Sequence, residues 1–327
     1  MRNAWLDALL LACAAGLGAA GVDPALPRYE PRAVVVDRSA SYVTPEGSIL
    51  VTGYNDMGDL IGKLVPLFTA SHSGVRFALD LRGTRFAPAA LASGASAFAP
   101  MGAEFSPAQL ADYRARARSD PIEVRVAHAS VDPRALSAPL AIFVHRDNPL
   151  ASLTLEQVER TFTGEATRWT NLGVAGEFGP RSVHLYGLAP DRALAFSLRD
   201  LAMHQRPFAA SLAGFPQSTD VVRHVAADPS GIGFAAAMRA TASVRVIAIA
   251  RHAGEEPVAP TEDNIMAGRY PLDRYLLVYA RRPLEPVARE FLRLMLSREG
   301  QEAVAATPQK YLPLSAREAA LERSKLE

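Results

Sequence analysis

The chain has 327 residues, and its 35 Lys and Arg residues nearly balance its 34 Asp and Glu residues. This length is sufficient for two lobes that each bury a hydrophobic core. Because the basic residues are scattered without interleaved aromatic residues, the sequence argues against a nucleic-acid partner and against attraction to an anionic membrane surface.

The N-terminal segment has the layout of a bacterial export signal. Arg2 precedes a short apolar stretch and small residues continue to Ala20, so residues 1–21 are predicted to be a signal peptide and residues 22–46 a linker. Cys13, the only cysteine, lies in a Leu-Leu-Ala-Cys sequence that resembles a lipoprotein cleavage box. The alternative is ordinary cleavage near Ala20, which removes Cys13. We therefore expect a periplasmic or other extracytoplasmic protein, either lipid-anchored or soluble.

Beyond residue 46, short strand-like runs alternate with amphipathic helical stretches. In chain order, strands are predicted at 48–52, 76–81, 123–129, 138–145, 182–188, 245–250 and 275–279, and helices at 56–70, 87–94, 154–161, 191–203, 219–227, 286–296 and 298–306. Ser152 or Thr154 is expected to cap the helix at 154–161. Such alternation is typical of an α/β fold with mainly parallel sheets.

Two of these strands stand out by their context. The strand at 138–145 follows a long polar stretch, and the strand at 275–279 follows the turn-rich residues 268–273. Both suit places where the chain crosses between two lobes. We therefore expect lobe 1 to comprise residues 47–141 and 273–327, and lobe 2 to comprise residues 142–272.

The sequence carries no recognisable set of catalytic or metal-binding residues. The seven histidines are spread singly, without the paired spacing of a zinc site, and no Gly-x-Ser-x-Gly nucleophile elbow occurs. Residues 58–64 mimic a phosphate-binding loop, but only three residues separate the two glycines and Leu64 replaces the required hydroxyl. We therefore predict a protein without enzymatic activity, metal or cofactor.

Three turns each lead from a predicted strand into a predicted helix and have polar or charged tips. They lie at residues 53–57, 83–86 and 187–192. A turn of this kind points bare backbone N–H groups toward whatever lies above it. Three such turns that converge between two lobes would hold a small polar or anionic solute.

Five motifs between residues 47 and 315 carry a resemblance to a known family. They are Asp-Asn-Pro-Leu with Leu-Thr-Leu-Glu-Gln at 147–157, Phe-Thr-Gly-Glu-Ala-Thr-Arg-Trp at 162–169, Val-Ala-Ala-Asp-Pro-Ser-Gly-Ile-Gly-Phe at 225–234, Glu-Asp-Asn-Ile with Gly-Arg-Tyr-Pro-Leu at 262–272, and Leu-Ser-Arg-Glu-Gly-Gln at 296–301. In this order they resemble the phosphate-binding proteins of ABC transporters, the PstS-like branch of the type 2 periplasmic binding proteins.

The resemblance implies a two-lobed α/β fold in which two crossing strands form a hinge and the lobes close on the ligand. It also implies two partners, a small anionic solute such as phosphate and an ABC transporter permease. Contact with a membrane would then occur only through that permease or through a lipid anchor.

The ligand-pocket motifs of that family are altered in this chain. The family's Gly-Ser-Asp-Thr-Met is similar to Gly-Tyr-Asn-Asp-Met at 53–57, and its Gly-Ser-Gly-Thr-Gly resembles Gly-Thr-Arg-Phe-Ala at 83–87. The aspartate, serine and arginine that the family carries in and after Ala-Asp-Ile-Ala-Pro-Met are absent from residues 97–103. Leu188 and residues 191–193 replace the last signature, an arginine followed by Ser-Gly-Thr.

The expected solute contacts follow from these turns. One carboxylate can accept the proton of HPO₄²⁻, and either Asp56 or Asp191 could do so, although each could instead cap a helix. Asp191 and Arg192 could also clamp a zwitterionic or larger solute, with Tyr54 and Phe86 as apolar walls. The predicted ligand-binding residues are Tyr54, Asn55, Asp56, Thr84, Arg85, Asp191 and Arg192.

The sequence thus predicts an exported solute-binding protein that captures phosphate or a related small anion for an ABC transporter. The altered pocket motifs motivate an alternative function. In that alternative, the two-lobed PstS-like protein has lost phosphate binding and acts as a sensor or interaction protein for a different ligand.

Overall fold

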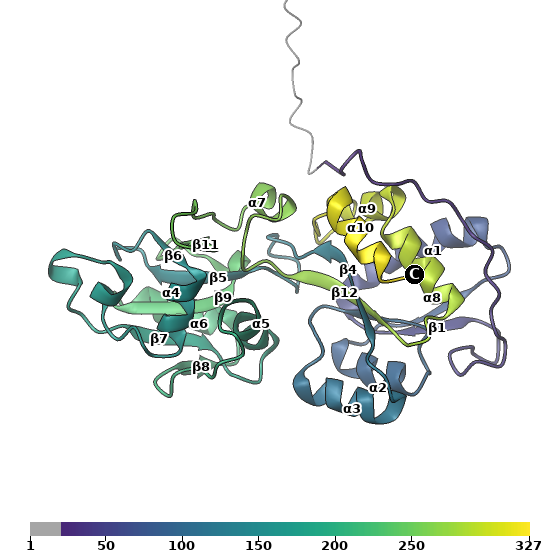
Figure 1. The fold of residues 1–327 in the computed structure, drawn as a ribbon, viewed down its shortest axis with the longest axis horizontal. Coiled ribbons are helices and arrows are strands. Elements are labelled where there is room, and N and C mark those ends of the chain that lie inside the picture. The colour runs from purple at the N-terminus through teal and green to yellow at the C-terminus, as the bar shows by residue number, and fades with distance from the viewer. Residues whose placement is uncertain (1–20) are drawn as a thin grey trace, which may run out of the picture.

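The computed structural model describes residues 21–327 as two α/β lobes that lie side by side (Figure 1). Lobe 1 contains the described residues before β5 together with β12 and everything that follows it. Lobe 2 contains the chain from β5 to the residues before β12, including β11 and α7. No helix within residues 21–327 combines the length and the apolar character needed to cross a bilayer. Cys13 and residues 1–20 of the predicted signal peptide lie outside the described residues.

Lobe 1 is built on two small sheets. β1 (Ile49–Thr52) pairs in parallel with β2 (Phe77–Asp80), while β12 (Tyr275–Ala280) lies between β3 (Ala99–Met101) and β4 (Ile122–His128) and is antiparallel to both. The helices of this lobe are α1 (Gly58–Ser71), α2 (Ala87–Ala92), α3 (Pro107–Ala117), α8 (Pro286–Met295), α9 (Arg298–Ala305) and α10 (Ala316–Ser324).

The core of lobe 1 is rich in aromatic residues. The rings of Phe68, Phe98 and Phe291 are fully buried, and the centroid of Phe291 lies 4.9 Å from that of Phe98 and 5.4 Å from that of Phe68. This cluster joins α1, the segment before β3 and α8, so residues that are more than 200 positions apart in the chain stabilise one core.

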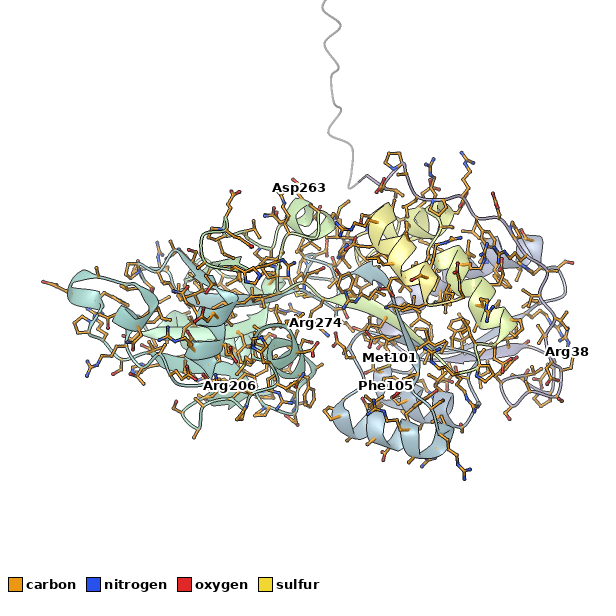
Figure 2. The ribbon with its side chains drawn as sticks, in the orientation of Figure 1. Arg38, Met101, Phe105, Arg206, Asp263 and Arg274 are labelled. Carbon is orange, nitrogen blue, oxygen red and sulfur yellow. The ribbon has the colours of Figure 1, made fainter. Side chains whose placement is uncertain are left out.

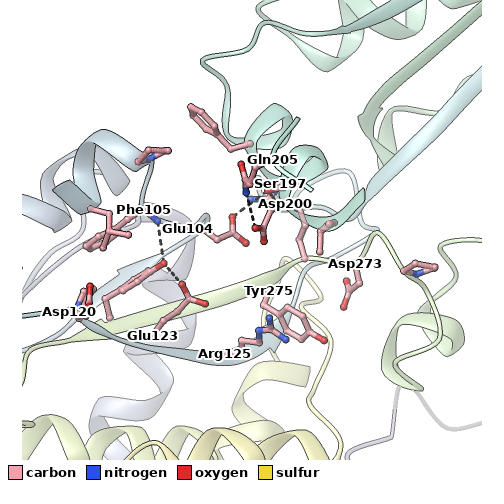
Figure 3. Close-up of a pocket in the computed structure, with 18 of the residues that line it drawn as sticks. Glu104, Phe105, Asp120, Glu123, Arg125, Ser197, Asp200, Gln205, Asp273 and Tyr275 are labelled. Atoms are coloured by element: carbon pink, nitrogen blue, oxygen red, sulfur yellow. Dashed lines mark hydrogen bonds between the residues drawn. The ribbon is translucent and has the colours of Figure 1, made fainter. Parts of the chain in front are cut away.

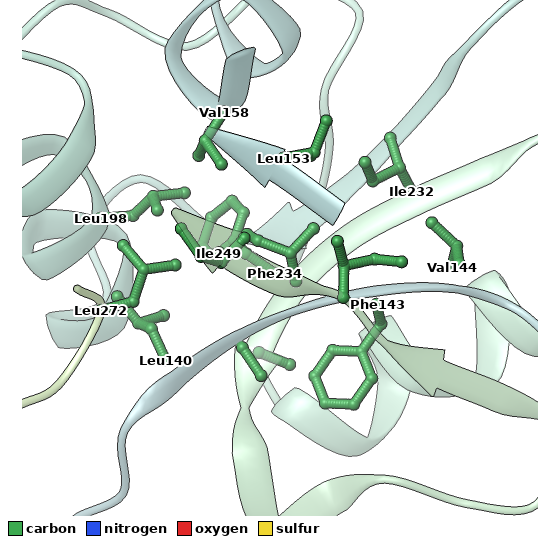
Figure 4. Packing of buried hydrophobic residues seen from close by; sticks show 14 of the residues in the cluster. Leu140, Phe143, Val144, Leu153, Val158, Leu198, Ile232, Phe234, Ile249 and Leu272 are labelled. Carbon is green, nitrogen blue, oxygen red and sulfur yellow. The ribbon is translucent and has the colours of Figure 1, made fainter. Parts of the chain in front are cut away.

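Lobe 2 contains a five-stranded sheet in the order β10-β5-β9-β7-β8 and a two-stranded sheet of β11 and β6. Its core packs residues such as Phe143, Val158, Leu198 and Phe234 between the sheet and the helices (Figure 4). The strands are β5 (Leu140–His145), β6 (Ser152–Thr154), β7 (His184–Leu188), β8 (Ala213–Phe215), β9 (Gly231–Ala236), β10 (Val244–Val246) and β11 (Ala248–Ala250), and the helices are α4 (Leu155–Phe162), α5 (Ala193–Ala202), α6 (Ser218–Ala227) and α7 (Glu262–Met266).

The two crossing strands correct the expectation of mainly parallel sheets. β5 runs antiparallel to β9 and β10, and β12 runs antiparallel to β3 and β4, so half of the strand pairings among the described residues are antiparallel. Each crossing strand enters its sheet from the junction of the lobes, whereas neighbours such as β4 and β9 run toward that junction (Figure 1). Opposite directions of entry produce antiparallel pairs.

Residues 22–46, expected as a linker, pack along the surface of lobe 1 (Figure 1). The side chains of Leu26 and Tyr42 are buried there. The backbone N–H of Tyr29 donates to Glu299 over 2.7 Å, and that of Arg32 donates to Glu290 over 2.9 Å. The segment lacks a periodic apolar pattern because its partners lie on helices some 260 residues further along the chain, so the sequence alone gave no sign of this packing.

Candidate functional site

A cavity of about 640 Å³ opens where the two lobes meet, beside the start of β12 (Figure 3). Lobe 1 contributes the loop between β3 and α3 and the start of β4, and lobe 2 contributes mainly α5. The volume lies within the range of roughly 300–1,000 Å³ that is usual for small-molecule sites. The polar lining consists of Glu104, Arg114, Asp120, Glu123, Arg125, Ser197, Asp200, Gln205, Arg251, Asp273, Arg274, Tyr270, Tyr275 and Tyr279.

Arg274 is the most buried cation of this lining, with a relative exposure of 5% (Figure 2). Its Nε donates to Ser197 Oγ on α5 over 3.0 Å, Nη2 donates to the carbonyl of Gly102 over 3.1 Å, and Nη1 donates to the carbonyl of Ala138 over 3.5 Å. All three acceptors are neutral, and within residues 21–327 no carboxylate forms an ion pair with it. A guanidinium has five N–H donors, so two remain without an assigned acceptor.

Glu104 meets Arg274 through a shared partner. The Ser197 hydroxyl that accepts from Arg274 lies 3.3 Å from Glu104 Oε2, and also 3.1 Å from the carbonyl of Ala193. Ser197 belongs to lobe 2 and Glu104 to lobe 1, so this hydroxyl links an acid and a base across the junction (Figure 3). The carboxylate of Glu104 remains exposed to the cavity.

The first predicted turn is closed by the protein's own groups. Asp56 is 9% exposed, and its Oδ2 accepts from the backbone N–H of Leu136 over 2.9 Å and from the hydroxyl of Tyr311. No side chain caps the 3-10 helix at Asn55–Met57 or the start of α1, so capping by Asn55 or Asp56, one of the roles expected for them, does not occur. Asp56 instead ties the turn to two other segments of lobe 1.

Tyr54 also faces the interior of the protein. Its hydroxyl lies 3.3 Å from Ser137 Oγ, and its ring covers Gly102, where any Cβ would overlap the ring. Burial of the phenol raises the pKa of Tyr54 to about 12. The glycine is thus required by a close approach, and Tyr54 packs directly behind the loop whose carbonyl accepts from Arg274.

The other predicted residues lie on the surface. Asn55, Arg85, Asp191 and Arg192 are exposed and Thr84 is partly exposed. Asp191 and Arg192 form an exposed ion pair at 3.6 Å, and the Arg85 guanidinium stacks over the ring of Phe86. The start of α5 has no side-chain cap, so Asp191 does not cap it.

None of the seven predicted ligand-binding residues lines the cavity between the lobes. Arg85 lines a smaller cavity, of about 140 Å³, between α2 and α3. The residues that do line the larger cavity, Arg274 and Glu104 above all, were missed. Two signals existed in the sequence: Glu104 directly follows the altered segment 97–103, and the adjacent charges Asp273 and Arg274 directly precede a buried strand.

A buried histidine lies beside the cavity. His128 Nδ1 lies 2.6 Å from Asp273 Oδ2, and its Nε2 lies 3.3 Å from Glu318 Oε2 on α10. Burial acts to lower the pKa of His128, but the hydrogen bonds and charges of the two carboxylates outweigh it and raise the pKa to about 9. His128 is therefore an imidazolium at neutral pH. Within residues 21–327, no cluster of three or more His, Cys, Asp or Glu side chains has a geometry suited to a metal ion.

Comparison with known proteins shows which family this chain belongs to. Residues 40–299 match the PBP superfamily domain. The phosphate-binding protein PstS of Pseudomonas aeruginosa is 31% identical to this chain over an alignment of 333 positions, which covers 97% of each of the two chains. The chain belongs to the PBP superfamily.

Two solved structures share the fold of this chain. An ABC-type phosphate transport receptor from Vibrio cholerae aligns with a TM-score of 0.56 and 18% identity, over 81% of this chain and 99% of that chain. PstS from Borrelia burgdorferi aligns with a TM-score of 0.54 and 13% identity, over 81% of this chain and 98% of that chain. The predicted resemblance to PstS-like proteins and the predicted two-lobed α/β fold are confirmed.

Proposed function

We propose that this protein is an extracytoplasmic solute-binding protein that captures phosphate or a related small anion between its lobes and hands it to the permease of an ABC transporter. Two of the similar proteins are named for phosphate binding and phosphate transport. A binding role agrees with these names.

The observation that carries the proposal is Arg274 at the cavity. A buried cation is costly unless an anion accompanies it, and the protein supplies only neutral acceptors to this guanidinium. An oxyanion in the cavity would receive the two N–H groups that have no assigned acceptor, and charge-assisted hydrogen bonds of this kind are the strong ones. Arg274 thus has the position and the chemistry of an anion-binding residue.

The contacts of Arg274 also support a clamp that responds to its ligand. The guanidinium donates to the β3–α3 loop of lobe 1 and to α5 of lobe 2. An anion bound to it would therefore lie where it can contact both lobes. In hinged binding proteins such contacts favour the closed form, and a permease can recognise that form. The solute contacts predicted for Tyr54, Asn55, Asp56, Thr84, Arg85, Asp191 and Arg192 stay predictions.

Isothermal titration calorimetry of the purified protein lacking residues 1–20 tests the proposal. Phosphate, sulfate and alkylphosphonates would be titrated separately at one pH and ionic strength. We expect saturable binding with one site per chain for at least one of these anions. Absence of binding to all of them would contradict the proposal.

The location can be tested independently. Fractionation of cells that express the full chain should place the protein outside the cytoplasm, and comparison with Cys13→Ala separates a lipid anchor from ordinary cleavage. A protein that stays in the cytoplasmic fraction would contradict the extracytoplasmic role.

A further inference from the structure

The charges that line the cavity between the lobes are mixed. Five carboxylates (Glu104, Asp120, Glu123, Asp200 and Asp273) face four guanidinium groups (Arg114, Arg125, Arg251 and Arg274). Because the imidazolium of His128 also lies beside Asp273, the lining offers no net positive charge to a doubly charged anion such as HPO₄²⁻. Like charges repel more strongly as water is displaced, so a pure dianion complements only part of this lining.

Three of the five carboxylates already have partners in the protein. Asp120 pairs with Arg114 at 2.5 Å, Asp273 with His128 at 2.6 Å, and Glu123 accepts the hydroxyl of Tyr279. A solute in the cavity would therefore add few hydrogen bonds or ion pairs to these three carboxylates.

Glu104, Glu123 and Asp200 have no cationic partner among the described residues, and of these three Glu104 and Asp200 are exposed while Glu123 is half-buried. Glu104 contacts only the Ser197 hydroxyl, and Asp200 contacts only the side-chain amide of Gln205, at 2.9 Å. They project into the cavity from opposite sides, Glu104 from lobe 1 and Asp200 from α5 of lobe 2 (Figure 3). Both are exposed in this structure, so water satisfies them until a solute displaces it.

We propose that the solute of this cavity is zwitterionic: it carries an acidic oxyanion that binds Arg274 and an ammonium group that binds Glu104 and Asp200. This inference rests on the proposed function and specifies its solute class. An ammonium offers three N–H donors, which is enough for both carboxylates. Each charge of such a solute meets a cavity charge that has only neutral partners among the described residues.

The remaining walls suit an organic solute. Phe105 stacks on Tyr279 with ring centroids 4.0 Å apart, and Phe196 and Tyr275 also face the cavity. Aromatic faces attract ammonium groups and pack against short alkyl chains. The volume of about 640 Å³ also leaves room for a carbon chain between the two charged ends of the solute.

A matched pair of probes tests the inference by calorimetry. 2-Aminoethylphosphonate and ethylphosphonate carry the same acidic group, and only the first has an amine. We expect the amine to tighten binding at least about 10-fold, which corresponds to about 1.4 kcal/mol. In Glu104→Gln and in Asp200→Asn this preference should shrink, and in the double variant it should disappear. Glu177→Gln, which alters an exposed glutamate of lobe 2 outside the cavity, is the matched control and should keep the preference.

The outcomes separate this inference from the proposed function. If phosphate or ethylphosphonate binds as tightly as 2-aminoethylphosphonate, the zwitterion inference is wrong while the anion-binding function stands. The inference is equally wrong if the double variant keeps the full preference for the amine. If neither these three probes nor sulfate binds, both proposals fail. Circular dichroism of each variant verifies that it is folded.

Discussion

Two buried charges near the junction of the lobes, Asp56 and Arg274, are accommodated in opposite ways. The carboxylate of Asp56 receives two protein donors, from Leu136 and Tyr311, and does not line the cavity. The guanidinium of Arg274 has only neutral acceptors and does line it. Burial of a charge therefore does not identify a ligand site by itself. What distinguishes the two is whether the protein supplies the complementary group.

The largest effect on stability is expected from Asp56→Ala. The change leaves the buried Tyr311 hydroxyl and the partly buried Leu136 N–H without an acceptor, and we expect it to lower the free energy of unfolding by about 3 kcal/mol. Urea denaturation followed by circular dichroism measures this. Asn55→Ala, at the exposed neighbouring position, should change the value by less than about 0.5 kcal/mol. If Asp56→Ala kept full stability and lost only ligand binding, Asp56 would be a solute contact instead of a structural tie.

Arg274→Gln should show the reverse pattern. We expect the affinity for the best-binding anion to fall at least about 10-fold, because the variant loses the charge that faces the cavity. The free energy of unfolding should change by less than about 1 kcal/mol, since removal of a buried, uncompensated charge offsets the lost hydrogen bonds. Calorimetry and urea denaturation on the same preparation measure both quantities. A strongly destabilised variant with unchanged affinity would show that Arg274 stabilises the fold and does not bind the anion.

His128 provides a third buried charge for the comparison, and one that responds to pH. Its pKa of about 9 in the folded protein lies above the value of about 6.5 expected for the unfolded chain. Its stabilising contribution is therefore complete below about pH 6.5 and is lost as the pH rises through 9, at roughly 1 kcal/mol per pH unit. Urea denaturation between pH 6.5 and 9 should show this loss in the native protein and a smaller one in His128→Gln. Equal slopes in the two proteins would show that His128 is not charged.

The smallest effect is expected at the exposed rim of the cavity. Arg114 and Asp120 form an ion pair in which both side chains are more than half exposed. Asp120→Asn should change the free energy of unfolding by less than about 0.5 kcal/mol, because exposed pairs gain little in water. A shift above about 1 kcal/mol in the urea experiment would mean that exposure is a poor guide to the importance of a charge here.

Local patterns predicted most of the fold. β1 and β12 lie within one residue of their predicted ranges, and Thr154 caps α4, one of the two residues expected to do so. α3 and α10 were missed because each buries too few apolar residues to show a helical period. Both begin with a capping box, Ser106 with Gln109 and Ser315 with Glu318, and that signal was available in the sequence.

The cavity was beyond such patterns. Arg274 and the carbonyl of Gly102 are 172 positions apart, and Ser197, which joins Arg274 to Glu104, lies in the other lobe. Only the path of the chain between the lobes brings these groups together. The turns at 53–57, 83–86 and 187–192 were identifiable because their strand-to-helix geometry is local, but local geometry does not determine which groups face a cavity.

A crystal structure of the protein grown with saturating 2-aminoethylphosphonate tests the central claim most directly. We expect the phosphonate oxygens to lie within hydrogen-bond distance of the Arg274 guanidinium and the amine to lie between Glu104 and Asp200. A ligand held instead by Asn55, Thr84 and Asp191, with the three hydrogen bonds of Arg274 unchanged, would contradict it.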